Sequence, residues 1–161
     1  MPILHTQLAG QAQAPDGKQI QIPPPVALQQ RGPVVQVSIT LQENFATTLV
    51  QQGNALPNPM TGWALIDTGA SNTCVDEKAA QLMKLPVIDV GSMTSASHAN
   101  TPSNIYPIQI EITGFKLRFQ SPRTMGAELA SQGLMLLLGR DLLQHCLLVY
   151  NGLTGQITLS L

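Results

Sequence analysis

Charge is scarce in this chain. Of its 161 residues, 11% are Asp, Glu, Lys or Arg, against about a quarter in typical soluble domains, and the formal net charge is −1. The few Lys and Arg residues are scattered, which excludes a basic stripe and predicts no nucleic-acid partner. Long apolar runs are also missing. None reaches the roughly 18 residues that a membrane-spanning helix needs, so we expect no membrane span in this chain.

Cysteine is almost absent as well. Cys74 and Cys146 stand outside any Cys-x-x-Cys pair, which favours reduced thiols packed as small apolar side chains. The first five residues, MPILH, lack the basic-then-apolar pattern of a secretory signal. We therefore expect a cytoplasmic location. The alternative, that the chain is the soluble part of a longer or anchored protein, stays open.

Length and hydrophobic content fit one folded domain. The hydrophobic fraction is 43%, and the length allows a sizeable core. Residues 1–33 are biased to Ala, Gln and Gly, and the proline triplet at 23–25 favours extended polyproline geometry over a helix. The sequence therefore predicts a flexible Pro/Gln-rich N-terminal segment over 1–33 and a folded domain over 34–161.

Apolar and polar residues alternate along much of the remaining chain, which is the pattern of half-buried strands. Residues 43–62 end in Pro and Gly and predict a long loop, with a helical turn near 46–50. Many short strands predict an all-β fold, a small barrel or sandwich. The expected strands cover residues 34–41, 63–66, 105–112, 115–120, 133–139 and the chain's last stretch, 147–161.

One or two short helices complete the prediction. Asp76 stands at the N-cap position of a run of helix formers that Pro86 stops, so we expect a helix between them. Asp141 is in a position to cap a second short helix over 140–146. Residues 125–132 are expected to form a surface segment.

A carboxylate follows an apolar strand in the stretch ALIDTGAS, residues 64–71. Ionising Asp67 beside buried apolar residues is costly unless neighbouring groups hold its charge. The stretch resembles the active-site signature of aspartic peptidases. A second stretch, LLLGRDLL at 136–143, resembles the apolar-Gly-Arg-Asp/Asn segment of the retropepsin-like, or retroviral-type, branch. The resemblance covers residues 34–161 apart from the 43–62 loop, and it implies a single-lobe retropepsin-like barrel.

The resemblance also implies a mechanism. Two carboxylates that face one another share a proton, and the charged one activates a water that attacks the peptide carbonyl. No metal, cofactor or covalent intermediate is needed. Two-lobed relatives carry two such motifs, whereas this chain carries one, so the implied enzyme is a homodimer acting on a polypeptide. The implied site residues are the catalytic Asp67, the loop residues Thr68, Gly69 and Ala70, and the supporting Leu138, Gly139, Arg140 and Asp141.

Individual roles follow from the same resemblance. Thr68 is implied to bond across to the partner's loop, and the backbone of Gly69 to donate to the carboxylate. Viral members often carry Asp where this chain has Ser71, so Arg140 needs another acceptor, such as a backbone carbonyl. The strands at 34–41 and 155–161 are implied to offer edges for the second copy. The Pro-rich N-terminal segment is a candidate self-processing site.

Other interpretations of the polar residues remain. Residues 91–104 match the place of the family's flap but contain no glycine after Gly91. Ser95, Ser97 and His98 lack the surroundings of a hydrolase pair, so loop polarity is the better interpretation. His145 and Cys146 lack the spaced second pair of a metal site. A catalytically silent dimerisation or peptide-binding module on the same fold is the alternative function.

Overall fold

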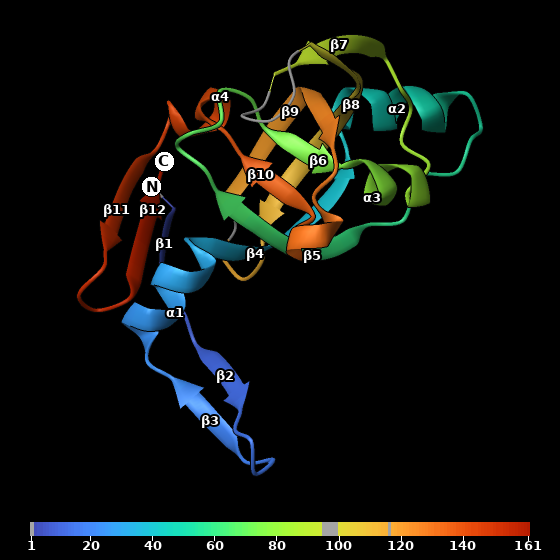
Figure 1. Cartoon of the computed structure of the whole chain (residues 1–161). Helices are drawn as coiled ribbons and strands as arrows, with labels where there is room; N and C mark the ends of the chain where they lie inside the picture. The colour runs from blue at the N-terminus through green and yellow to red at the C-terminus, as the bar shows by residue number, and fades with distance from the viewer. Residues whose placement is uncertain (1, 95–99, 116) are drawn as a thin grey trace.

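In the computed structural model, which describes residues 2–94, 100–115 and 117–161, seven strands form one sheet. Its order is β4-β5-β10-β6-β9-β8-β7, and β4 also pairs with β8. This extra pairing closes six strands into a barrel and leaves β7 as an addition to β8 (Figure 1). The all-β prediction is confirmed. The bounds are β4 Val34–Leu41, β5 Met60–Ile66, β6 Cys74–Asp76, β7 Asp89–Met93, β8 Thr101–Ile112, β9 Leu117–Ala127 and β10 Leu136–Leu138.

The alternation in the sequence fills the barrel. In β4, Val35, Val37 and Ile39 are buried, and in β8 the side chains of Ile108 and Ile110 are fully buried. Each such aliphatic side chain contributes about 1.5–3 kcal/mol by leaving water. The antiparallel register pairs Ile39 with Ile110, which holds the barrel closed.

A second sheet lies beside the barrel and joins the two ends of the chain (Figure 1). Its order is β1-β12-β11, with β1 at Ile3–Gln7, β11 at Leu147–Asn151 and β12 at Gln156–Ser160. The prediction that residues 34–41 and 155–161 offer free edges is wrong. Strand β12 lies between β1 and β11, and β4 lies between β5 and β8. The edges of this small sheet are β1 and β11.

The first 33 residues contain more regular structure than the sequence predicted. After β1, strands β2 (Gly10–Gln13) and β3 (Gln19–Ile22) form a hairpin that projects from the body in Figure 1. Helix α1 (Pro24–Arg31) replaces the expected polyproline stretch. Proline is well tolerated in the first turn of a helix, because the N–H that it lacks has no intrahelical partner there. The domain division at residue 33 stays a prediction.

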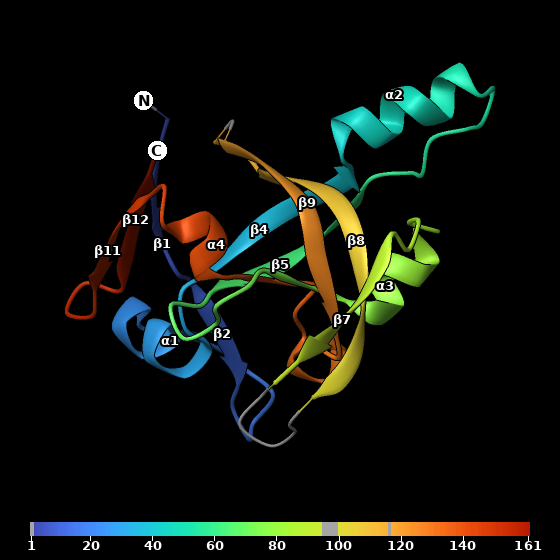
Figure 2. The same cartoon turned by 90° about the horizontal axis from the view of Figure 1, so that it is seen from above.

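Four α-helices occur in the described residues, rather than one or two. Besides α1 they are α2 (Glu43–Gln51), α3 (Glu77–Leu82) and α4 (Arg140–Leu143), with a 3-10 turn at Ala130–Gln132. The expected loop at 43–62 begins with α2, because the Gln42 side chain accepts hydrogen bonds from the N–H groups of Asn44 and Phe45. Figures 1 and 2 both place α2 on the side of the barrel away from β11.

Asp76 caps α3 as predicted, accepting from the N–H of Ala79 at 3.1 Å. Its other oxygen accepts from the N–H groups of Leu129 and Ala130, both at 2.9 Å. The prediction of a surface segment over 125–132 holds in part: Met125 and Leu129 are buried, whereas residues 128 and 130–132 are exposed. The predicted capping role of Asp141 is wrong, because Gly139 holds the N-cap position of α4.

None of the helices in the described part of the chain is long and apolar enough to cross a membrane.

Candidate active site

The Asp67 loop begins where β5 ends, and the pairing of β10 fixes its position. Strand β10 runs parallel to β5, with Leu138 opposite Ile66. Asp67, the first residue after β5, donates its backbone N–H to the Leu138 carbonyl at 3.0 Å. The two sequence segments that carry the resemblance therefore meet side by side.

The Asp67 carboxylate is held by its own loop. Its Oδ1 atom accepts from the N–H of Gly69 at 2.8 Å and from the N–H of Ala70 at 3.2 Å. These two hydrogen bonds fix the orientation of the carboxylate relative to its loop. The side chain remains half-buried, which leaves it open to the cleft beside it.

Arg140 fastens this loop from α4. One guanidinium nitrogen donates to the carbonyls of Thr68 and Gly69 at 2.8 and 3.0 Å, and the other donates to the Ser71 hydroxyl at 2.7 Å. Its backbone N–H also donates to the Ala70 carbonyl at 3.0 Å. Arg140 therefore finds its acceptors in two backbone carbonyls and a hydroxyl, and it does not need an acidic partner at position 71.

Thr73 is a supporting residue that the sequence interpretation missed. It is fully buried, donates its hydroxyl to Asp141 Oδ1 at 2.8 Å and accepts from the N–H of Gly139 at 3.1 Å. Gly139 itself lies so close to the other segment that a Cβ there would collide with the Asn72 carbonyl. No signal in the sequence pointed to Thr73, because threonine is ordinary in a polar loop.

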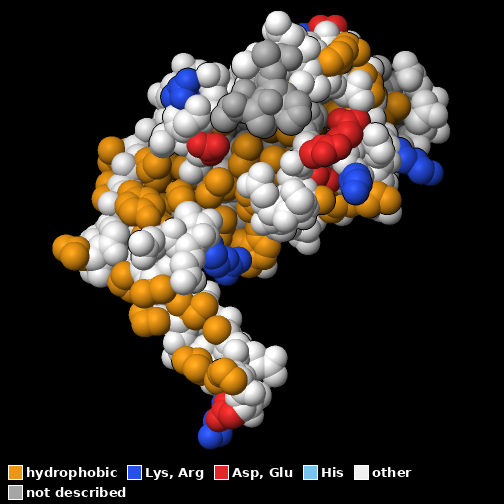
Figure 3. Space-filling view, in the orientation of Figure 1, with side chains coloured by type: hydrophobic (Ala, Val, Ile, Leu, Met, Phe, Trp, Pro, Cys, Tyr) orange, Lys and Arg blue, Asp and Glu red, His pale blue; other side chains and the backbone are white. Residues whose placement is uncertain are grey.

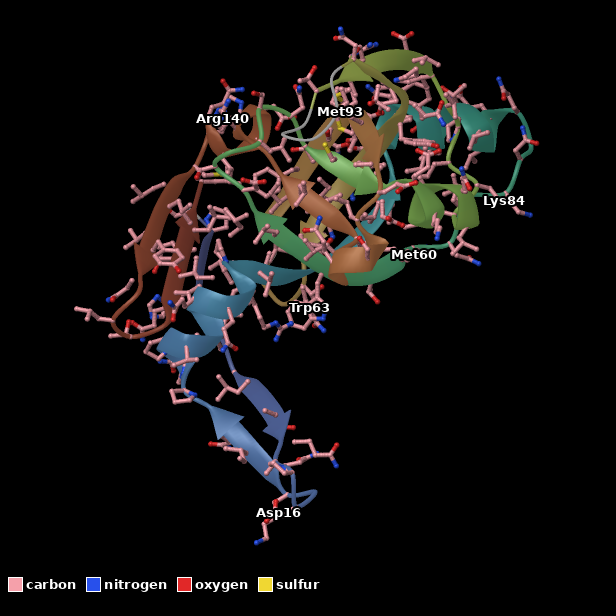
Figure 4. The ribbon with its side chains drawn as sticks, viewed as in Figure 1. Asp16, Met60, Trp63, Lys84, Met93 and Arg140 are labelled. Atoms are coloured by element: carbon pink, nitrogen blue, oxygen red, sulfur yellow. The ribbon has the colours of Figure 1, made fainter. Side chains whose placement is uncertain are left out.

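A cleft of about 650 Å³ opens beside Asp67. Its described lining combines the loop with an apolar wall of Cys74, Met93, Met125 and Leu137. Figure 4 shows Met93, at the end of β7, and Arg140, at the start of α4, on the same side of the molecule. Asp67 is the one acidic residue among the described lining residues of this cleft.

The cysteines do not offer a nucleophile. Burial raises the pKa of Cys74 to about 11, and the nearby carboxylates of Asp141 and Asp67 add to the effect. Burial also raises the pKa of Cys146. Both thiols are free and stay protonated near neutral pH, so neither is a ready thiolate. His145 is exposed, and among the described residues no cluster of His, Cys, Asp or Glu has the arrangement of a metal site.

The remaining predicted features are placed in part. Thr68 is exposed, and its bond across a dimer stays a prediction. The expected flap at 91–104 corresponds to the ends of β7 and β8, but its centre lies outside the described residues, together with Ser95, Ser97 and His98.

Several solved structures are similar to this chain, including the following two. One is a retropepsin-like aspartic protease from Rickettsia conorii, 12% identical, with a TM-score of 0.46, covering 99% of this chain and 94% of that chain. The other is the retroviral protease-like domain of Ddi1 from Leishmania major, 13% identical, with a TM-score of 0.39, covering 73% of this chain and 81% of that chain. No protein-family model matches the sequence, and no curated protein matches it either. Since the identities and TM-scores are this low, a functional assignment has to rest on the geometry of the Asp67 loop.

Proposed function

We propose that this protein is a homodimeric aspartic endopeptidase of the retropepsin type. The observation that carries the proposal is the Asp67 loop. A half-buried carboxylate is bonded by two backbone N–H groups, braced by Arg140 and open to a cleft with an apolar wall.

The second carboxylate comes from a second copy of the chain. Asp67 has no acidic neighbour among the described residues that line its cleft, so one chain supplies half of a dyad. Strands β1 and β11 offer the edges of the small sheet. Ile3, Leu147 and Val149 point outward from them, 57%, 65% and 48% exposed. Figure 3 shows hydrophobic side chains gathered on this side of the molecule. An apolar strand edge in water is a site for pairing with another chain.

In the dimer, the two Asp67 carboxylates share one proton and hold a water between them. The charged carboxylate takes a proton from this water while the water oxygen attacks the scissile carbonyl. The protonated carboxyl group donates a hydrogen bond to the developing oxyanion. The N–H groups of Gly69 and Ala70 keep Oδ1 in place during this exchange. The rate should therefore be bell-shaped in pH, since two coupled acids titrate in two macroscopic steps.

The substrate is an extended polypeptide with apolar side chains beside the scissile bond. Met93, Met125 and Leu137 form the apolar wall near Asp67. An apolar wall favours Leu, Met or Phe over charged residues at the substrate positions beside the scissile bond. The flexible methionine side chains allow the wall to adapt to these different shapes. We place the enzyme in the cytoplasm as part of the same proposal, because both cysteines are free.

The test compares the protein with Asp67→Asn, which keeps the shape of the side chain and removes its ionisable group. Both proteins are incubated with an apolar peptide library at mildly acidic pH, and the products are identified by mass spectrometry. We expect cleavage by the parent alone. Equal cleavage by Asp67→Asn would end the proposal. Tight peptide binding by the parent without any product would favour the silent peptide-binding module.

A further inference from the structure

A carboxylate outside the catalytic loop collects three side-chain donors. Glu77, at the start of α3, accepts at Oε1 from the Tyr106 hydroxyl at 2.7 Å, Asn104 Nδ2 at 2.8 Å and Gln81 Nε2 at 3.0 Å. Tyr106 is 1% exposed. Burial raises the pKa of Tyr106 to about 12, and the bond to Glu77 adds to the effect, so its hydroxyl remains a donor.

Strand β9 is shaped to receive this carboxylate. A Cβ at Gly126 would collide with Glu77 Oε2, so the glycine permits the close approach. The Gly126 carbonyl in turn accepts from the Ser103 hydroxyl at 2.7 Å. Three elements, α3, β8 and β9, are thus tied together at one place.

This place is the base of a two-stranded ribbon. Strand β8 pairs with β9 only from Ile105 onward, and residues 101–104 pair instead with β7. Among the described strands, β7 has β8 as its one partner. Residues 101–104 of β8 are thus not held to β9 by backbone pairing. The side-chain hydrogen bonds from Ser103 to Gly126 and from Asn104 to Glu77 hold this part of the ribbon in place.

The ribbon carries one wall of the cleft. Met93 ends β7 and pairs with Thr101, and Met93 and Thr94 line the same cleft as the Asp67 loop. A shift of the ribbon base moves this wall relative to Asp67, while the bonds within the Asp67 loop stay as they are.

We propose that Glu77 is a positioning residue that holds the β7–β8 ribbon at the correct distance from the catalytic loop. The enzymatic part of this inference rests on the proposed function, whereas the anchoring part does not. Contacts from the ribbon wall act on bound substrate and transition state alike, so weakening them changes KM and leaves kcat close to its original value.

The experiment uses the full-length protein with Glu77→Ala, Glu77→Gln and the control Glu111→Ala. Glu111 is a carboxylate near the far end of β8, in an exposed pair with Arg118. For Glu77→Ala we expect KM to rise by about fivefold, as if the displaced wall cost the bound substrate the equivalent of one hydrogen bond, with kcat within about twofold. Backbone amides of β7 should exchange faster with solvent. Glu77→Gln should keep KM and the exchange of the β7 amides close to those of the parent, because its amide oxygen accepts the same hydrogen bonds. Glu111→Ala should change neither KM nor the exchange.

Asn104→Ala provides a second route, because it removes the anchor from the ribbon and leaves α3 intact. We expect the same rise in KM and the same faster exchange. Unchanged KM and unchanged exchange in both Glu77→Ala and Asn104→Ala would overturn the inference, and so would a loss of kcat at constant KM. If the parent cleaves no peptide, the proposed function fails, and the exchange of the β7 amides alone decides whether Glu77 anchors the ribbon.

Discussion

Replacing Thr73 with valine tests whether the two site segments depend on one buried hydroxyl. The substitution keeps the shape and removes a group that donates to Asp141 and accepts from the N–H of Gly139. The Gly139 N–H loses its acceptor, whereas Asp141 Oδ1 keeps its hydrogen bond from the Leu142 N–H at 3.0 Å. One buried group without a partner costs about 2 kcal/mol, which lowers Tm by about 4–8 °C for a chain of this size.

The assay is urea and thermal unfolding at one fixed protein concentration, because dimerisation also shifts apparent stability. Thr73→Ser should recover most of the loss, since it keeps the hydroxyl. Thr61→Val is the matched control: Thr61 lies exposed on β5, and the change should stay within about 0.5 kcal/mol. A loss below about 1 kcal/mol for Thr73→Val would refute the argument that this hydroxyl joins the segments.

Three further predictions concern assembly, alkaline stability and processing. Activity per chain should fall on dilution, and Leu147→Glu on the exposed β11 face should move this fall to higher concentration. The control Val87→Glu changes an exposed apolar residue between α3 and β7 and should not move it; sedimentation at matching concentrations checks both. The raised pKa of Cys74 means that the native state keeps its proton longer than the unfolded chain does. Stability is therefore fully present below pH 9 and falls by about 2–3 kcal/mol as the pH rises to about 11, and urea midpoints for Cys74→Ala should show a flatter slope there. Incubation at mildly acidic pH should release N-terminal fragments cut within the projecting residues 10–22, and N-terminal sequencing that finds cuts only inside the barrel would contradict this.

The sequence predicted those parts of the fold that depend on local pattern. Alternation located β4 and β8, and the Asp76 cap located α3, because these signals lie within a few neighbouring residues. The pairing of β1 with β12 joins Leu4 to Leu159 across almost the whole chain, and no local pattern records such a contact. The proline triplet was misinterpreted because proline favours both an extended chain and the first turn of a helix.

The candidate site divides in the same way. Asp67 and Arg140 were found because two short segments resemble known ones. Thr73 and Glu77 were missed because their importance comes from partners that only the closed barrel brings near them. A buried hydroxyl or a carboxylate at a helix start has many ordinary explanations, and the donors around it decide between them.

The bonds of the Asp67 loop bear on how a dimer would acquire activity. Arg140 satisfies the carbonyls of Thr68 and Gly69 within one chain, and the carboxylate takes both of its backbone donors from the same loop. A loop whose carboxylate and backbone carbonyls are already paired has little backbone to rearrange when a second copy arrives. Association then needs to supply the second carboxylate and to cover the apolar edge at β11, and it does not have to build the loop. In the proposed dimer, the free energy of association would therefore come mainly from the small sheet, and the catalytic geometry would come from the barrel. Substitutions on β11 and substitutions around Thr73 should accordingly act on different quantities, the dimer dissociation constant in the first case and the activity of the assembled dimer in the second.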